Sequence, residues 1–153
     1  MERTTTVAVI GGGAAGLTAA LFLARAGIDV EIFDQDRSIL KRARLNNLPG
    51  SLDLEGRSLL SSLRTSLDGH GVTPHAAKVD DIVPGDDGFT VHAGDERVAA
   101  RYVVLATGQG TLKLASLPLD TTDARQPFVK VNVVTDRWGA TSAPGVWAAG
   151  VVA

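Results

Sequence analysis

The strongest structural signal in this 153-residue chain is the segment Val7-Ala8-Val9-Ile10-Gly11-Gly12-Gly13-Ala14-Ala15-Gly16. Its four apolar residues, rich in β-branched side chains, predict a buried strand. Glycines follow at positions 11, 13 and 16 with the spacing G-x-G-x-x-G, and a helical pattern begins directly after them. A strand, a glycine turn and a helix in this order are typical of a dinucleotide-binding βαβ unit.

Each of these three glycines has a physical reason to be there. Gly11 permits the tight turn out of the strand, Gly13 lets the backbone approach a pyrophosphate, and Gly16 lets the helix pack closely on the strand. The first N–H groups of that helix have no intrahelical acceptor, and the helix dipole adds about half a positive charge there. The segment therefore predicts an anion site. The alternative interpretation is a glycine turn in a βαβ unit without a ligand.

An acidic residue follows the glycines at the distance that a dinucleotide site needs. Residues 18–26 predict a helix that ends at Gly27, and residues 28–33 alternate like a strand that leads into Asp34. A carboxylate about 20 residues beyond the glycines suits hydrogen bonding to the ribose hydroxyls of an adenosine. It disfavours NADP, because a 2′-phosphate would meet a like charge at a cost of about 1 kcal/mol even in water. FAD and NAD both remain.

Four basic residues beyond Asp34 offer a different interpretation. They are Arg37, Lys41, Arg42 and Arg44, and they could in principle receive a phosphate. A short basic cluster of this kind is more often a solvated loop, and that is the interpretation we favour.

Composition excludes several classes of function. The net charge of -2 offers no basic field for nucleic acid and no polybasic membrane anchor. The chain has no cysteine, which excludes disulfides, thiolate metal sites and dithiol chemistry by the chain itself. The three histidines show no spacing typical of a metal site, so no metal ligand is predicted. A cytoplasmic location is the default expectation, with no membrane segment.

The rest of the chain predicts an α/β fold. Leucines at helical spacing predict a helix over residues 59–67, with Asp53 as its N-cap. Strands are expected in two parts over residues 72–83, then over 89–93, 97–106, 128–134 and 146–150. Three of them are joined by short turns. The predicted fold is thus a Rossmann-like parallel sheet flanked by helices, with a small antiparallel β-meander.

Four blocks in this order carry a resemblance to a known family. They are residues 9–17 (VIGGGAAGL), 47–50 (NLPG), 105–108 (LATG) and 141–150 (TSAPGVWAAG). Together they span nearly the whole chain. The chain resembles the FAD-binding domain of thioredoxin reductase-like flavoproteins, within the class of flavoproteins with two dinucleotide-binding domains.

The resemblance implies FAD as cofactor and a set of cofactor-binding residues. The predicted set is Gly11, Gly13, Ala14, Ala15, Gly16, Asp34, Gln35, Lys41, Asn47, Val79, Thr107, Gly108 and Gly150. The residues of the glycine turn would hold the pyrophosphate and Asp34 the adenosine ribose. Asn47 would lie against the flavin ring, and the backbone of Val79 would meet the adenine. The Thr107-Gly108 turn would pack near the cofactor, and Gly150 would begin the segment that reaches the ribityl chain.

The chain also departs from the family pattern. Only about 40 residues separate Gly108 from Gly150, too few for the second nucleotide-binding domain, for NADPH, that the family places there. The redox-active cysteine pair is absent with it. The family's Ala-Gly-Asp becomes Ala149-Gly150-Val151, and the helix expected next has no residues left to form it. We therefore expect residues 1–153 to form a single dinucleotide-binding domain with an intact adenosine half and a reduced flavin half.

Three hypotheses of function follow. The first is a minimal FAD-binding oxidoreductase that needs a separate electron donor, and we find no residue to nominate as a catalytic acid, base or nucleophile because the flavin carries the chemistry. The second is a non-catalytic FAD- or NAD-binding module that docks on a partner. The third is an NAD-binding protein without flavin. A separate reductase or redox protein is the expected partner, and self-association would cover the exposed apolar surface.

Overall fold

The computed structural model describes residues 3–109, 114–124, 126 and 129–153 of the chain. Its strands are β1 (Arg3–Ile10), β2 (Val30–Asp34), β3 (Arg44–Leu45), β4 (Leu54–Glu55), β5 (His75–Ala76), β6 (Asp81–Gly85), β7 (Gly88–Ala93), β8 (Glu96–Leu105), β9 (Thr121–Asp123), β10 (Val131–Val133) and β11 (Val146–Ala148). Its helices are α1 (Ala14–Arg25) and α2 (Gly56–Asp68), with two 3₁₀ helices, η1 (Ile39–Arg42) and η2 (Gly150–Val152).

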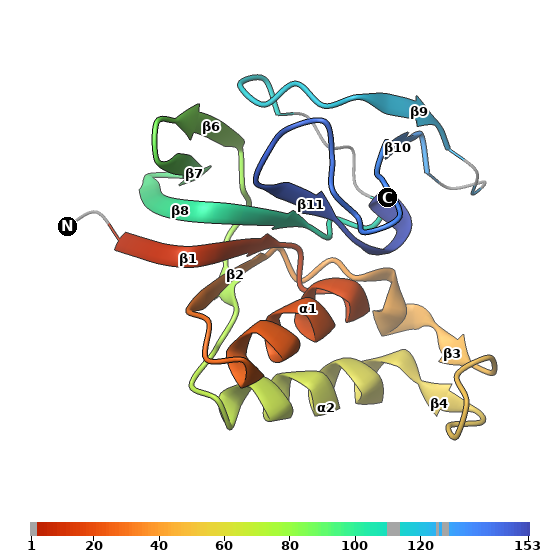
Figure 1. Cartoon of the computed structure of the whole chain (residues 1–153). Coiled ribbons are helices and arrows are strands. Elements are labelled where there is room, and N and C mark those ends of the chain that lie inside the picture. The colour runs from red at the N-terminus through yellow and green to blue at the C-terminus, as the bar shows by residue number, and fades with distance from the viewer. Residues whose placement is uncertain (1–2, 110–113, 125, 127–128) are drawn as a thin grey trace.

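One sheet of seven strands organises the molecule (Figure 1). Its order is β5-β2-β1-β8-β7-β6, and β11 pairs with β8 as well. The pairs among β5, β2, β1, β8 and β11 are parallel, whereas β6, β7 and β8 form an antiparallel meander. Strand β8 thus belongs to both parts, and the predicted Rossmann-like sheet with its meander is confirmed.

The two α-helices lie together on one side of the sheet (Figure 1). On that side Val7 and Val9 of β1 pack with Leu17 of α1 in one buried cluster. On the opposite side Ala8 and Ile10 belong to a second cluster, to which β10 and η2 also contribute. Strand β1 is therefore buried on both faces, which is why its sequence is a continuous apolar run. No helix among the described residues is long and apolar enough to cross a membrane.

The carboxyl ends of four parallel strands meet at one edge of the sheet. Ile10 at the end of β1 is paired with Phe33 on β2 and with Leu105 on β8, and Leu105 is paired with Ala148 on β11. The chain leaves β1 through α1 to β2 on one side, while β8 lies on the other side. In open α/β sheets, ligands bind outside the carboxyl ends of strands at such a switch point.

Some predicted boundaries were wrong. Helix α1 begins four residues earlier than the predicted start at residue 18, directly after the glycine turn. Glu55, not Asp53, is the N-cap of α2. Asp53 instead lies in the loop between β3 and β4 with φ 58°, and its carboxylate pairs with Arg44. The reason is the antiparallel β3–β4 pair, which delays the helix. Strand β9 was not predicted. Strand β10 lies within the strand predicted from Phe128, a residue outside the described ones.

Candidate functional site

Two glycines at the junction of β1 and α1 are required by the fold itself, Gly11 in the turn and Gly16 in the first turn of the helix. Gly11 has φ 111°, and a β-carbon on it would lie 2.2 Å from the carbonyl oxygen of Ala106. A β-carbon on Gly16 would lie 1.9 Å from the carbonyl oxygen of Gly11. Strand β8 and helix α1 therefore approach the turn so closely that no side chain fits at either position.

Gly13 is different, because the space beside it is open. It is the N-cap of α1 with φ -79°, a conformation that any residue adopts. Within the described residues, a β-carbon on Gly13 would meet a single heavy atom within 4 Å, the hydroxyl oxygen of Ser38 at 3.6 Å. No side chain of the described residues caps the helix. The first backbone N–H groups of α1, including those of Ala14 and Ala15, therefore face a site where an anionic group is favourable.

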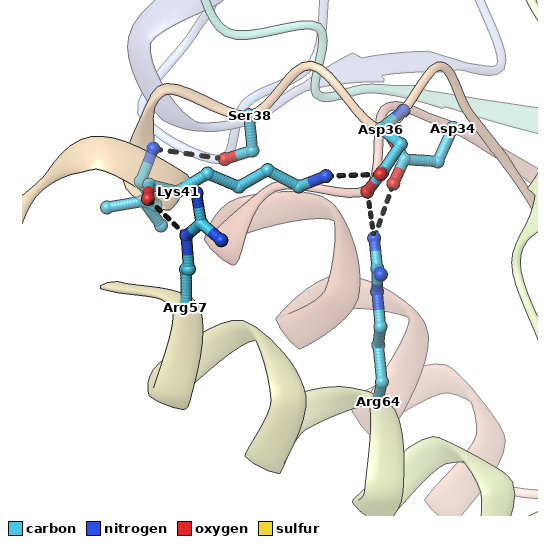
Figure 2. A network of polar contacts seen from close by, with 7 residues as sticks. Asp34, Asp36, Ser38, Lys41, Arg57 and Arg64 are labelled. Atoms are coloured by element: carbon cyan, nitrogen blue, oxygen red, sulfur yellow. Dashed lines mark hydrogen bonds and ion pairs between the residues drawn. The ribbon is translucent and has the colours of Figure 1, made fainter. Parts of the chain in front are cut away.

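Asp34, the last residue of β2, lies beside this turn with only 8% of its surface exposed. Its Oδ1 accepts a hydrogen bond from the backbone N–H of Asp36 at 3.0 Å. Its Oδ2 accepts one from Nη2 of Arg64, on α2, at 2.9 Å (Figure 2). A β-carbon on Gly12 would lie 2.3 Å from the same Oδ2. The carboxylate is thus fixed by the turn, by its own loop and by a helix 30 residues further along the chain.

Asp36 extends the charged network around Asp34. It accepts a hydrogen bond from Arg64 at 3.1 Å and pairs with the ammonium group of Lys41 on η1 (Figure 2). The hydrogen bond from Lys41, followed by that from Arg64, lowers the pKa of Asp36 below its ordinary value.

Two of the four basic residues that follow Asp34 in the sequence form ion pairs in the structure. Lys41 is paired with Asp36, and Arg44 with Asp53 at 3.4 Å. The structure thus gives two of the four basic residues local carboxylate partners, as expected of a solvated loop.

A pocket of about 410 Å³ lies between η1 and α2 beside this network. It is lined by Lys41, Arg57, Leu60, Ser61, Arg64, Thr65 and Asp68. Its three cationic side chains are matched by three carboxylates, Asp68 in the lining and Asp34 and Asp36 next to it. Two of the cationic side chains, Lys41 and Arg64, are thus paired with carboxylates, whereas Arg57 donates to the carbonyl oxygen of Lys41. In the described part of the chain, no group of three potential metal ligands occurs.

Two further predicted positions reach the same edge of the sheet. Thr107 follows β8, and its hydroxyl oxygen is buried without a partner among the described residues. Gly150, with φ 81°, brings the segment after β11 against the start of α1, since a β-carbon on it would lie 2.8 Å from Cβ of Ala15. Gly108 next to Thr107 has φ 65° and turns the chain away from β8.

The remaining predicted residues lie further out. Val79 lies between β5 and β6, partly buried against the core, and β5 pairs with β2 at Asp34. Gln35 is exposed next to Asp34. Asn47 is exposed in the loop between β3 and β4, which projects from the body of the molecule (Figure 1). The structure therefore does not bring Asn47 to the edge where the other predicted residues gather.

Sequence reasoning missed three residues of this site. Gly12 carries no signal beyond the run of glycines, and Ser38 lies in an irregular segment. Arg64 did have a signal, because it lies between the buried residues Leu60 and Leu67 on the apolar stripe of α2. A charged side chain in such a stripe needs a partner of opposite charge, which here is Asp34.

The residues of this edge fit the ADP half of a dinucleotide. Gly13 leaves room for a diphosphate at free helix N–H groups, the hydroxyl of Thr107 lacks a partner among described residues, and Asp34 is held nearby. These features define a dinucleotide-binding α/β domain. The chain belongs to the pyridine nucleotide-disulphide oxidoreductase family, whose model matches residues 5–126.

Relatives within this family are flavoprotein reductases. The chain is 29% identical over 118 residues to a thioredoxin reductase of Listeria monocytogenes, covering 75% of this chain and 37% of the relative. It is 30% identical over 151 residues to a ferredoxin–NADP reductase of Lactobacillus helveticus, covering 93% of this chain and 47% of the relative. The chain thus spans less than half the length of these two relatives. Thioredoxin reductases and ferredoxin–NADP reductases of this family bind FAD.

A solved structure supports the fold over the whole chain. The crystal structure of an oxidoreductase from Agrobacterium tumefaciens superposes with a TM-score of 0.87 at 16% identity. The match covers 100% of this chain and 90% of that one. At this low identity the likeness establishes the shared fold.

Proposed function

We propose that residues 1–153 bind FAD as one dinucleotide-binding domain and serve a flavoprotein oxidoreductase that receives electrons from a separate donor. The observation that carries this proposal is the open Gly13 at the start of α1, placed at the same sheet edge as the held carboxylate of Asp34. An open glycine, free helix N–H groups and a ribose-binding acid are the three elements that an adenine dinucleotide needs.

The residues have separate roles in this proposal. The backbone N–H groups of Gly13, Ala14 and Ala15 bind the diphosphate, and Gly11 and Gly16 let strand and helix come close enough to present them. Asp34 binds the ribose. The backbone of Val79, three residues beyond the partner of Asp34 on β5, is the predicted contact for the adenine.

The same edge supplies the residues nearer the flavin. The hydroxyl of Thr107, which has no partner in the described part of the chain, contacts the middle of the cofactor together with Gly108. Gly150 lies against Ala15 and starts the segment along the ribityl chain. Gln35 and Lys41 lie at the outer side of the ribose, where Lys41 acts through Asp36. Asn47 is the one predicted contact that requires the β3–β4 loop to move toward the site.

Electron transfer is the chemistry that bound FAD supplies. These residues include no cysteine for a dithiol step. We therefore infer that the electron donor and acceptor lie outside residues 1–153. The names of the relatives point to ferredoxin, NADP and thioredoxin as the classes of partner to try first. A cytoplasmic location and self-association stay predictions.

A non-catalytic module is the second candidate, and two observations favour it. Val151 stands where the resemblance leads us to expect an acid, and Asn47 lies away from the other site residues. These two features reduce the number of protein contacts available to the flavin ring. The contacts available to the adenosine half of the cofactor do not depend on them.

Two measurements separate these candidates. Purified protein is incubated with FAD, NAD or ADP, and its melting temperature is recorded for each ligand. The proposal predicts a larger increase with FAD than with NAD, whereas stabilisation by NAD alone would indicate an NAD-binding protein without flavin. Bound flavin is then mixed with NADPH, NADH or reduced ferredoxin. Reduction by one of these donors supports the oxidoreductase, and failure with all three supports the module.

A further inference from the structure

The carboxylate of Asp34 already accepts hydrogen bonds at about half of its acceptor positions. Its two oxygens offer about four acceptor positions in total. The N–H of Asp36 occupies one position on Oδ1, and Nη2 of Arg64 occupies one on Oδ2. Two acceptor positions remain, one on each oxygen. This number equals the number of free hydroxyls, 2′ and 3′, on the ribose of an adenosine 5′-diphosphate, so the hydrogen bonds from the described residues leave one acceptor position for each.

Arg64 is placed where it can set the direction of those remaining positions. It extends from the face of α2 that carries the buried Leu60 and Leu67, and Figure 2 shows it pointing from the helix toward Asp34 and Asp36. Its Nη2 contacts both carboxylates, at 2.9 Å and 3.1 Å. Its Nε is buried and has no acceptor among the described residues. The guanidinium group thus leaves its Nε donor without an acceptor among the described residues while Nη2 contacts Asp34.

The neighbours of Arg64 hold it in this position. Lys41 pairs with Asp36 from the other side, so Asp36 is fixed between two cations (Figure 2). The N–H of Asp36 is in turn the second donor to Asp34. Arg64 of α2 therefore contacts Asp34 directly, whereas Lys41 of η1 acts on it only through Asp36.

We propose that Arg64 is a positioning residue for ribose recognition: it orients the carboxylate of Asp34 so that both free acceptor positions meet the two ribose hydroxyls. This inference rests on the proposed function, because it concerns the same adenosine half of the site. Arg64 acts through Asp34, and a buried carboxylate without its cation loses both its orientation and its compensating charge.

The test compares two nucleotides that differ in a single hydroxyl. ADP and 2′-deoxy-ADP are titrated by calorimetry into the wild-type chain and into the variants Arg64→Gln, Arg64→Lys and Arg57→Gln. Arg57 is the matched control, because it lies on the same helix and lines the same pocket but bonds to the carbonyl oxygen of Lys41. FAD retention by the wild-type chain is measured first, which tests the proposed function separately.

The wild-type chain is expected to prefer ADP by about tenfold, the value of one hydrogen bond to a charged group. In Arg64→Gln we expect ADP to bind about tenfold more weakly and the preference to fall to about twofold or less. Arg64→Lys should restore part of the preference, since it keeps the charge without the planar fork. Arg57→Gln should keep the wild-type preference.

Two results would overturn the inference. One is an Arg64→Gln variant that keeps the wild-type preference for ADP. The other is an equal loss for both nucleotides, which a merely structural role of Arg64 would produce. If Arg64→Gln does not fold, as judged by circular dichroism, Arg64→Lys carries the test: a preference for ADP equal to that of the wild type would show that the guanidinium contact does not orient Asp34 for the ribose. A wild-type chain that binds neither FAD nor ADP overturns the proposed function together with this inference.

Discussion

Gly12 makes room for the carboxylate of Asp34: a β-carbon at position 12 would lie 2.3 Å from Oδ2 of Asp34. That oxygen also accepts the hydrogen bond from Arg64. The second glycine of the triplet, which the dinucleotide motif does not specify, therefore contributes to the site through Asp34.

Gly12→Ala is predicted to weaken FAD binding by about tenfold or more. The new methyl group forces the buried carboxylate to move, which removes a hydrogen bond to a charged group worth about 1.5–3 kcal/mol. Fluorescence titration of FAD measures the change. Gly69→Ala at the end of α2 is the control, because its nearest contact would be an ordinary 3.4 Å. An affinity of the Gly12 variant equal to that of the control would contradict this account.

Gly13→Ala is predicted to fold like the wild type and yet to lose FAD. Its β-carbon meets only an ordinary contact with Ser38 within the described residues, so the ligand-free melting temperature should stay within about 2 °C of the wild-type value. The same methyl group occupies the space in which the diphosphate would approach the backbone. The affinity for FAD should therefore fall by about tenfold or more, as measured by gel filtration and titration. Unchanged affinity would place the diphosphate elsewhere.

Gly16→Ala should behave in the opposite way. Its β-carbon would lie 1.9 Å from the carbonyl oxygen of Gly11, so the helix must shift away from the strand. We expect the ligand-free protein to lose about 1–3 kcal/mol of unfolding free energy, the usual cost of overpacking. Urea unfolding without FAD measures this. A variant as stable as the wild type would show that α1 does not pack on the turn as described.

The network around Asp36 predicts a dependence of stability on pH. The hydrogen bonds from Lys41 and Arg64 lower the pKa of Asp36 on folding. Such a carboxyl stabilises the folded state above its ordinary pKa of about 4, and the stabilisation is lost as the pH falls through the lowered value. The contribution should be about 1 kcal/mol or less, because Asp36 is largely exposed and its ion pairs are screened.

Urea unfolding at a series of pH values from about 6 to about 2.5 tests this dependence. The unfolding free energy of Asp36→Asn should fall less steeply than that of the wild type below about pH 4. The difference between the two curves reports on the charge of Asp36. Parallel curves would show that Asp36 contributes nothing through its charge.

Asp34 is predicted to reject a 2′-phosphate. We expect AMP to bind at least about fivefold more tightly than adenosine 2′,5′-bisphosphate, because the extra phosphate meets the carboxylate at a cost of at least about 1 kcal/mol, and more where water is excluded. The variant Asp34→Ser should show a smaller difference between its affinities for the two nucleotides. Competition of both nucleotides with FAD measures it. Equal or tighter binding of the bisphosphate would mean that Lys41 and Arg64 leave their carboxylates to take the phosphate.

The sequence predicts the fold well where a pattern is local. The apolar run ending at Ile10, the glycine spacing and the acid at Asp34 predict the first βαβ unit, because each depends on neighbouring residues. The meander was predictable for the same reason, since its turns are short. The N-cap of α2 was not, because the pairing of two two-residue strands, β3 and β4, overrode the local preference of Asp53.

At the candidate site, the sequence could indicate only the residues that belong to a local motif. Gly13 and Asp34 belong to the dinucleotide-binding motif. The hydrogen bond that fixes Asp34, however, comes from Arg64, which lies 30 residues away on α2. No local pattern connects Asp34 with Arg64. A charged residue between the buried Leu60 and Leu67 indicates only that a partner of opposite charge is needed. Asn47 shows the converse case. The resemblance assigns it to the flavin, whereas the loop that carries it projects from the body of the molecule (Figure 1).

The most direct test of FAD binding at this site is a visible absorption spectrum of the purified chain. The protein is incubated with excess FAD, separated from free ligand by gel filtration, and its flavin content is compared with its protein content. Gly13→Ala is treated in the same way. We expect flavin bands with about one FAD per chain for the wild type and little or none for the variant. A wild-type protein that elutes colourless would contradict this expectation.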